Sequence, residues 1–110
     1  MRCAFPLLVA VLTAGCASVS DLRTKEPVFS GETDKAPEQY AGCVMEAWRA
    51  GGLDPSYSPV PNGVEILVRD VGPDLLLRAD SVPGRGATVR MASRLPYGYA
   101  DFAEAARRCQ

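Results

Sequence analysis

Apolar residues recur at helical spacing in two segments of this chain. From Pro37 to about Ala50 they stand at positions i, i+3, i+4, i+7 and i+8, which places them on one face of a helix. Pro37 suits the first helical turn, and Gly51-Gly52 suits the end. The same spacing returns from about Tyr99 to Cys109. The two apolar stripes are Tyr40, Cys43, Val44, Ala47 and Trp48 in the first helix, and Phe102, Ala105, Ala106 and Cys109 in the second.

Between these helices, apolar and polar residues alternate, which is typical of strands. The alternation predicts strands at 64–69, 75–80 and 87–95, separated by turn sequences at 71–74 and 83–86. Residues 54–63 are rich in proline and turn formers, and we expect a loop there. The short connections favour an antiparallel meander. The inward sets are Val64, Ile66 and Val68; Leu75, Leu77 and Ala79; and Ala87, Val89, Met91 and Leu95.

The predicted order α-β-β-β-α indicates an α+β fold. We expect a two-layer sandwich, in which a three-stranded antiparallel meander sheet carries both helices on one face. This domain would cover residues 37–110. Residues 16–36 are polar and without sustained periodicity, which predicts a flexible tether with a span of about 25 Å. The apolar group Pro27-Val28-Phe29 either belongs to this tether or docks on the domain as an extended segment.

The first residues have the composition of a secretory signal. A basic start precedes an apolar run from Ala4 to Ala14, which at about eleven residues is shorter than the roughly 20 needed to cross a bilayer. The following sequence Leu12-Thr13-Ala14-Gly15-Cys16 resembles the lipobox of small Gram-negative envelope lipoproteins, with leucine one position early. The resemblance implies removal of residues 1–15 and lipidation of Cys16. Because Ala17 stands where an aspartate often retains such proteins at the inner membrane, it also implies the outer membrane, on its periplasmic face.

Two cysteines remain once Cys3 leaves with the signal and Cys16 carries lipid. Cys43 and Cys109 form an even pair in an oxidising compartment, and each lies on the apolar stripe of its helix. We therefore predict a disulfide between them; the alternative is two free buried thiols. The bridge would close a loop of about 66 residues, for which the chain-entropy model gives about 4 kcal/mol.

Charge and residue types limit the possible chemistry. The 12 basic and 13 acidic residues nearly balance, so charge gives no indication of nucleic-acid binding. The chain has no histidine and therefore lacks the usual general base and zinc ligand. No metal or cofactor motif is present, and we expect a protein that is not an enzyme. A hydrolase using carboxylates remains an alternative, although a small sandwich rarely provides the necessary cleft.

The outward face of the predicted sheet is the candidate binding face. Arginine and apolar side chains are suited to interfaces, and both kinds point outward if the alternation holds. The alternative is a solvated face in which Glu65 and Asp80 form cross-strand pairs with arginine. The candidate residues are Arg69, Arg78, Arg90, Arg94, Leu67 and Leu76.

These features predict a membrane-anchored, non-enzymatic module facing the periplasm. It would bind or organise another component of the cell envelope through the candidate face. The expected partner is an envelope protein or a peptidoglycan-associated molecule, in addition to the membrane that holds the lipid. The alternative is an inhibitor of a lysozyme-type hydrolase that inserts a loop at 82–86 or 54–62.

Overall fold

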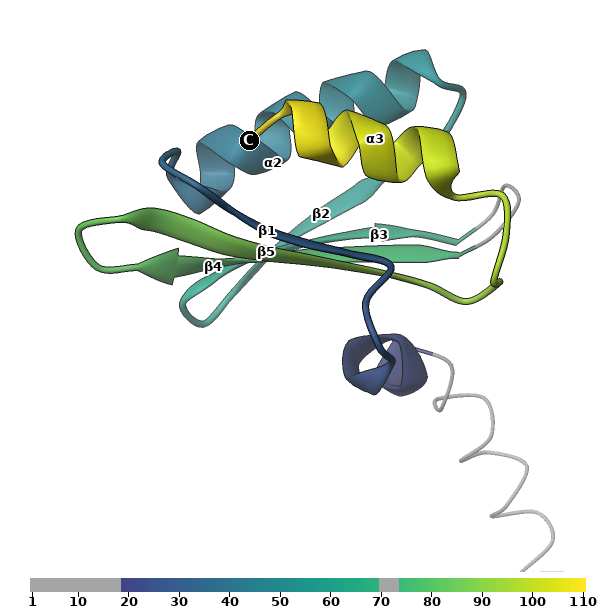
Figure 1. The fold of residues 1–110 in the computed structure, drawn as a ribbon, viewed down its shortest axis with the longest axis horizontal. Helices are drawn as coiled ribbons and strands as arrows, with labels where there is room; N and C mark the ends of the chain where they lie inside the picture. Colours follow the sequence, from purple (N-terminus) through teal and green to yellow (C-terminus); the bar gives the residue numbers. More distant parts are fainter. Residues whose placement is uncertain (1–18, 70–73) are drawn as a thin grey trace, which may run out of the picture.

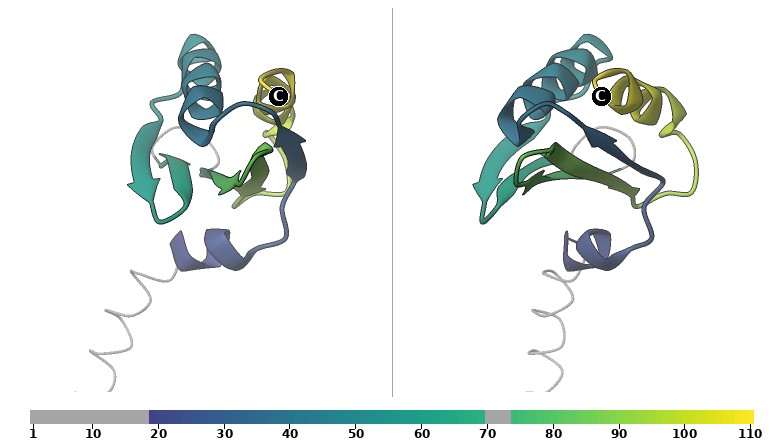
Figure 2. Two further views of the ribbon diagram at one scale, coloured as in Figure 1. Left: turned by 90° about the vertical axis from the view of Figure 1, so that its left-hand side faces the viewer. Right: turned by 60° about the vertical axis from the view of Figure 1, so that its left-hand side comes forward.

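The computed structural model describes residues 19–69 and 74–110. It contains an antiparallel sheet with strand order β1-β5-β4-β3-β2, and α2 and α3 cover one face of it (Figure 1). A further helix at residues 19–24 lies against the opposite face (Figure 2). The expected α+β class is confirmed, but the sheet has five strands, and three was wrong. The elements are β1 (Phe29–Thr33), α2 (Pro37–Ala50), β2 (Ser56–Val60), β3 (Gly63–Val68), β4 (Leu75–Val82), β5 (Gly86–Ser93) and α3 (Ala100–Arg108).

The two strands that the sequence did not predict lie at the edges of the sheet. β2 occupies half of the expected loop at 54–63 and pairs with β3, with Tyr57 opposite Ile66. Its first four residues are exposed, so it has no apolar alternation, and it contains Pro59, which edge strands tolerate. β1 pairs with β5, with Phe29 opposite Met91. β2 is defined by backbone pairing with β3 rather than by a buried face, whereas β1 also packs one face inward, since Phe29 contacts the core and Thr33 is buried.

The structure also differs from the tether predicted for residues 16–36. Residues 19–24 are helical and Phe29–Thr33 is a strand, so most of the described part has regular structure. The signal sequence and the lipidation residue Cys16 lie outside the described residues. Within residues 19–69 and 74–110, no helix is long and apolar enough to cross a membrane.

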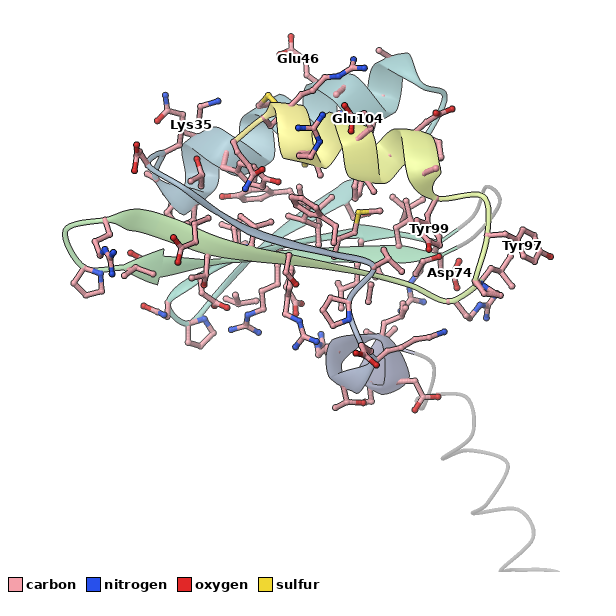
Figure 3. The ribbon with its side chains drawn as sticks, in the orientation of Figure 1. Lys35, Glu46, Asp74, Tyr97, Tyr99 and Glu104 are labelled. Atoms are coloured by element: carbon pink, nitrogen blue, oxygen red, sulfur yellow. A yellow bond between two sulfur atoms is a disulfide. The ribbon has the colours of Figure 1, made fainter. Side chains whose placement is uncertain are left out.

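The core lies between the sheet and the two covering helices, where side chains from both layers meet (Figure 3). α2 has the predicted bounds, and α3 begins one residue after the predicted start, with Tyr99 as its N-cap. The predicted inward residues of the three central strands are all buried except Leu95, because β5 ends at Ser93. The 3.6-residue and two-residue patterns therefore identified the core, since both arise from burial on one face.

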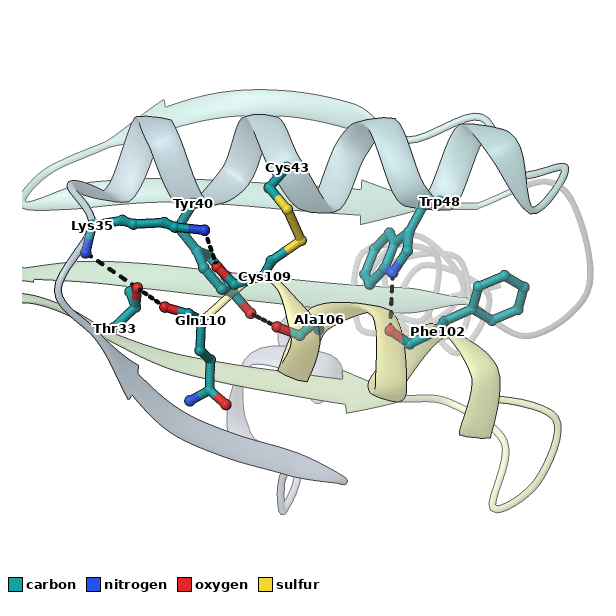
Figure 4. Close-up of a disulfide and its surroundings, with 9 residues drawn as sticks. All are labelled: Thr33, Lys35, Tyr40, Cys43, Trp48, Phe102, Ala106, Cys109 and Gln110. Atoms are coloured by element: carbon teal, nitrogen blue, oxygen red, sulfur yellow. Dashed lines mark hydrogen bonds between the residues drawn. A yellow bond between two sulfur atoms is a disulfide. The ribbon is translucent and has the colours of Figure 1, made fainter.

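Two hydrogen bonds and the disulfide join α2 to α3 (Figure 4). Tyr40 Oη donates to the carbonyl oxygen of Ala106 at 2.7 Å, and Trp48 Nε1 donates to that of Phe102 at 3.0 Å. Burial raises the pKa of Tyr40, so its phenol stays neutral and able to donate. The predicted bridge between Cys43 and Cys109 is confirmed, with Cα atoms 5.8 Å apart.

Gln110 contacts β1 at the edge of the sheet. Thr33 Oγ1 donates to the carbonyl oxygen of Gln110 at 3.0 Å, and Gln110 Nε2 donates to the carbonyl oxygen of Glu32 at 2.8 Å. Gly31 leaves room for this arrangement, because a Cβ atom there would collide with Gln110 Nε2. The contact from Gln110 Nε2 occupies one backbone carbonyl group that the edge strand would otherwise present to other chains.

Candidate functional site

The face of the sheet opposite α2 and α3 brings most of the candidate residues together. The strand register places Glu65 opposite Arg78 and Arg78 opposite Arg90, forming a charged row across β3, β4 and β5. The adjacent row is apolar, with Leu67 opposite Leu76 and Leu76 opposite Ala92. Side chains that end in nitrogen atoms point outward from this face beside the helix at 19–24 (Figure 3).

Arg69 and Arg94 lie at one end of this face and outside the charged row. Arg69 directly follows β3 and is exposed. Arg94 directly follows β5, and its Nε atom lies 3.3 Å from Asp74 Oδ2. We use the name arginine face for the following set: Arg23, Arg69, Arg78, Arg90, Arg94, Leu67, Leu76 and Ala92.

The helix at 19–24, called the docked helix below, covers the apolar row. Leu22 is only 3% exposed and packs with Leu76 and Ala92, and the partly buried Leu67 lies beside them. These residues form a second small core, separate from the one under α2 and α3. Sequence reasoning missed this helix because Leu22 is surrounded by polar residues. The sequence did contain one indication of it: Leu67 and Leu76 both point outward, and two adjacent apolar side chains on a sheet face are expected to be covered by another element.

Polar contacts fix the docked helix to the sheet. Arg23 donates from Nε and Nη2 to the two carboxylate oxygens of Glu65, each at 3.2 Å. These hydrogen bonds, together with the negative charge of Glu65, raise the pKa of Arg23. Arg90 donates to the carbonyl oxygens of Lys25 at 2.9 Å and of Arg23 at 3.4 Å. A cation at the carboxyl end of a helix also interacts favourably with the helix dipole.

Two carboxylates of the arginine face, those of Glu65 and Asp74, lie further inward than the arginines they pair with, whereas Asp80 is as exposed as its partner Arg78 (32% and 33%). The Glu65 side chain is 7% exposed, whereas those of its partners Arg23 and Arg78 are 50% and 33% exposed. The Asp74 side chain is 14% exposed, against 57% for Arg94. The guanidinium groups of Arg23 and Arg94 therefore remain accessible to solvent although each is paired with a carboxylate.

A pocket of about 240 Å³ opens between the docked helix and the sheet. Leu22, Leu76 and Ala92 give it apolar walls, and Arg23 and Arg90 line it among its charged groups. Drug-sized ligands usually occupy about 300–1,000 Å³, so this pocket suits a smaller group. Two wider hollows, about 440 and 540 Å³, flank the turn between β4 and β5.

The described residues provide no metal centre. Across residues 19–69 and 74–110, no three or more His, Cys, Asp or Glu side chains are placed to hold an ion. The ionisable groups around the pocket pair with one another: Arg78 lies 3.5 Å from Glu65 and its Nε donates to Asp80 at 2.9 Å. The arrangement is suited to binding through guanidinium groups.

Replacement of Leu22 by alanine is expected to release the docked helix. Burial of a leucine contributes about 2 kcal/mol. Its loss should raise the fraction of molecules in which the docked helix has left the sheet by about 30-fold. Trypsin cleavage after Arg23, followed by mass spectrometry, measures that population. Ser20→Ala is the matched control, because Ser20 is exposed on the same helix. Equal cleavage rates in the two variants would show that Leu22 does not hold the helix.

The chain matches no protein-family model, no curated protein and no solved structure. Its function is therefore argued from the arginine face and from the N-terminal sequence.

Proposed function

We propose that this protein is a non-enzymatic lipoprotein of the cell envelope. Its lipid is attached to Cys16 and holds it at the periplasmic face of the outer membrane. The lipobox-like sequence ending at Cys16 supports the anchor. The disulfide between Cys43 and Cys109 supports an oxidising compartment, where such bonds persist.

The function we propose is binding of an anionic envelope component through the arginine face. The observation that carries this proposal is that the guanidinium groups of Arg23 and Arg94 lie outside the less exposed carboxylates of Glu65 and Asp74. Guanidinium groups bind phosphate and carboxylate by paired hydrogen bonds, so an anion that reaches Arg23 or Arg94 would meet hydrogen-bond donors. Glu65 and Asp80 are engaged with Arg78, which favours a binding role over acid–base catalysis.

The anchor is tested by mass spectrometry of the mature protein from a Gram-negative host. We expect Cys16 as the first residue, carrying diacylglyceryl and acyl groups. The Cys16→Ser variant should leave the membrane fraction, because no lipid can be attached. An unmodified first residue, at Cys16 or beyond it, would contradict the proposed anchor.

The binding face is tested by photocrosslinking in intact cells. A photoreactive residue at Thr88, exposed on the sheet face that carries Arg90, should form adducts with the envelope component. The matched control is the same residue at Glu46, which is exposed on α2 (Figure 3). Adducts at Glu46 that equal or exceed those at Thr88 would contradict the assignment of this face.

A second candidate function is inhibition of a lysozyme-type hydrolase. The observation in its favour is the exposed turn between β4 and β5, where Pro83, Gly84 and Arg85 stand between two hollows. The other segment considered for insertion, 54–62, is mainly strand β2. Titration of lysozyme with the purified domain separates the two functions. The main proposal expects unchanged lysozyme activity, whereas inhibition that disappears in Arg85→Ala would support the inhibitor.

A further inference from the structure

We infer that the anionic component bound by the arginine face is the phospholipid headgroup layer of the membrane that carries the anchor. The domain would then lie on that membrane with α2 and α3 turned away from it. This inference rests on the proposed lipidation of Cys16, and it names the partner of the same site.

The first argument is the length of chain between the anchor and the docked helix. Cys16 and Val19, the first described residue of the docked helix, are three residues apart in the sequence. Whatever conformation the intervening residues adopt, they span at most about 11 Å. A flexible chain of about twenty residues would instead have a span of about 25 Å. Because the docked helix is part of the domain, the chain between the anchor and the domain is too short to let the domain lie far from the membrane.

The second argument is the side of the domain from which the anchor leaves. The docked helix lies on the sheet face opposite α2 and α3 (Figure 2). Leu22 is buried against Leu76 there, and Arg23 is paired with Glu65, so the helix is held to the domain. The short link consequently brings the arginine face, and not the helical layer, to the membrane surface.

The third argument is chemical complementarity with lipid phosphates. The accessible groups of the ion pairs are the guanidinium groups of Arg23 and Arg94, while Glu65 and Asp74 lie beneath them. Arg69 is exposed directly after β3, and the exposed Lys25 donates from Nζ to the carbonyl oxygen of Arg94 at 2.8 Å. The carboxylates of Asp21, Glu26 and Asp80, which are exposed or partly exposed, offset part of this charge. Salt screens the remaining attraction, so it operates only once the anchor holds the domain close. Arg23 and Arg90 line the pocket beside the docked helix together with Glu65 and Asp80, and a guanidinium group there can pair with a headgroup phosphate.

The orientation can be measured on the full mature protein in vesicles of phosphatidylethanolamine and phosphatidylglycerol. A fluorophore is attached at Thr88→Cys or at Glu46→Cys, with the Cys43–Cys109 bridge oxidised. Nitroxide-labelled headgroups serve as the quencher. We expect several-fold stronger quenching at position 88 than at position 46. The pair Arg69→Gln and Arg94→Gln should weaken quenching at position 88, whereas Arg49→Gln on α2 should not.

The possible outcomes are distinct. Mass spectrometry of the same sample reports whether Cys16 carries lipid, and Trp48 fluorescence reports whether each variant is folded. A lipidated, folded protein with equal quenching at both positions would overturn the inference and leave the anchor intact. Loss of quenching at position 88 on addition of peptidoglycan would likewise overturn it, since the face would then prefer the glycan polymer. Absence of lipid would overturn both the anchor and the orientation.

Discussion

Replacing Cys43 and Cys109 together by alanine is expected to lower the free energy of unfolding by about 4 kcal/mol. The bridge spans 66 residues and links two helices that pack on one face of the sheet. Its removal enlarges the unfolded ensemble, while the folded core loses little apolar contact. Small domains have a total stability of only about 5–15 kcal/mol, so the loss is a large part of the whole.

Urea denaturation followed by far-ultraviolet circular dichroism measures this loss. The slope of free energy against urea should also rise, because the uncrosslinked unfolded chain exposes more surface. A reducing agent provides the control: it should destabilise the natural protein and leave the double variant unchanged. A difference below about 1 kcal/mol between the two proteins would show that the bridge contributes little constraint.

Replacing Trp48 by alanine is expected to cost about 3–5 kcal/mol. Trp48 is fully buried and packs edge-on against Phe102, with ring centroids 6.4 Å apart. The change removes this contact and also leaves the carbonyl oxygen of Phe102 without its indole donor. Because α2 and α3 meet at this point, the loss should weaken the whole helical layer.

Chemical denaturation measured by circular dichroism tests this prediction without relying on tryptophan fluorescence. Trp48→Phe keeps an aromatic ring and loses the donor, so it should cost about 1–3 kcal/mol. The exposed aromatic control is Tyr97→Ala; Tyr97 is 68% exposed, and its loss should change stability by less than about 0.5 kcal/mol. Equal effects at Trp48 and Tyr97 would contradict the assigned role of the indole.

The sequence predicted the parts of the fold in which burial is periodic. α2 and the inward residues of β3, β4 and β5 were recognisable because each buries one face. The disulfide was recognisable because both cysteines lie on such faces. β1 and β2 were not, since an edge strand is stabilised by backbone pairing on one side and tolerates Gly31 or Pro59.

The sequence predicted which sheet residues form the candidate site, but it did not predict the docked helix that covers part of it. Leu67, Leu76, Arg78 and Arg90 lie together as the alternation implied. The sequence pattern did not indicate that Leu22 would cover the two leucines, because one buried residue produces no periodicity. Nor could it indicate that Arg90 binds carbonyl oxygens at the end of the docked helix, a contact that depends on tertiary structure.

The contacts of Gln110 with β1 bear on how this protein can be fused to a reporter. A tag attached after Gln110 would start from a residue whose carbonyl and amide groups are both engaged by the strand, and it would compete for them. A tag ahead of Cys16 would be cut away during the proposed maturation. Insertion between Gly84 and Arg85, in the exposed turn, leaves the disulfide, the contacts of Gln110 and the arginine face undisturbed.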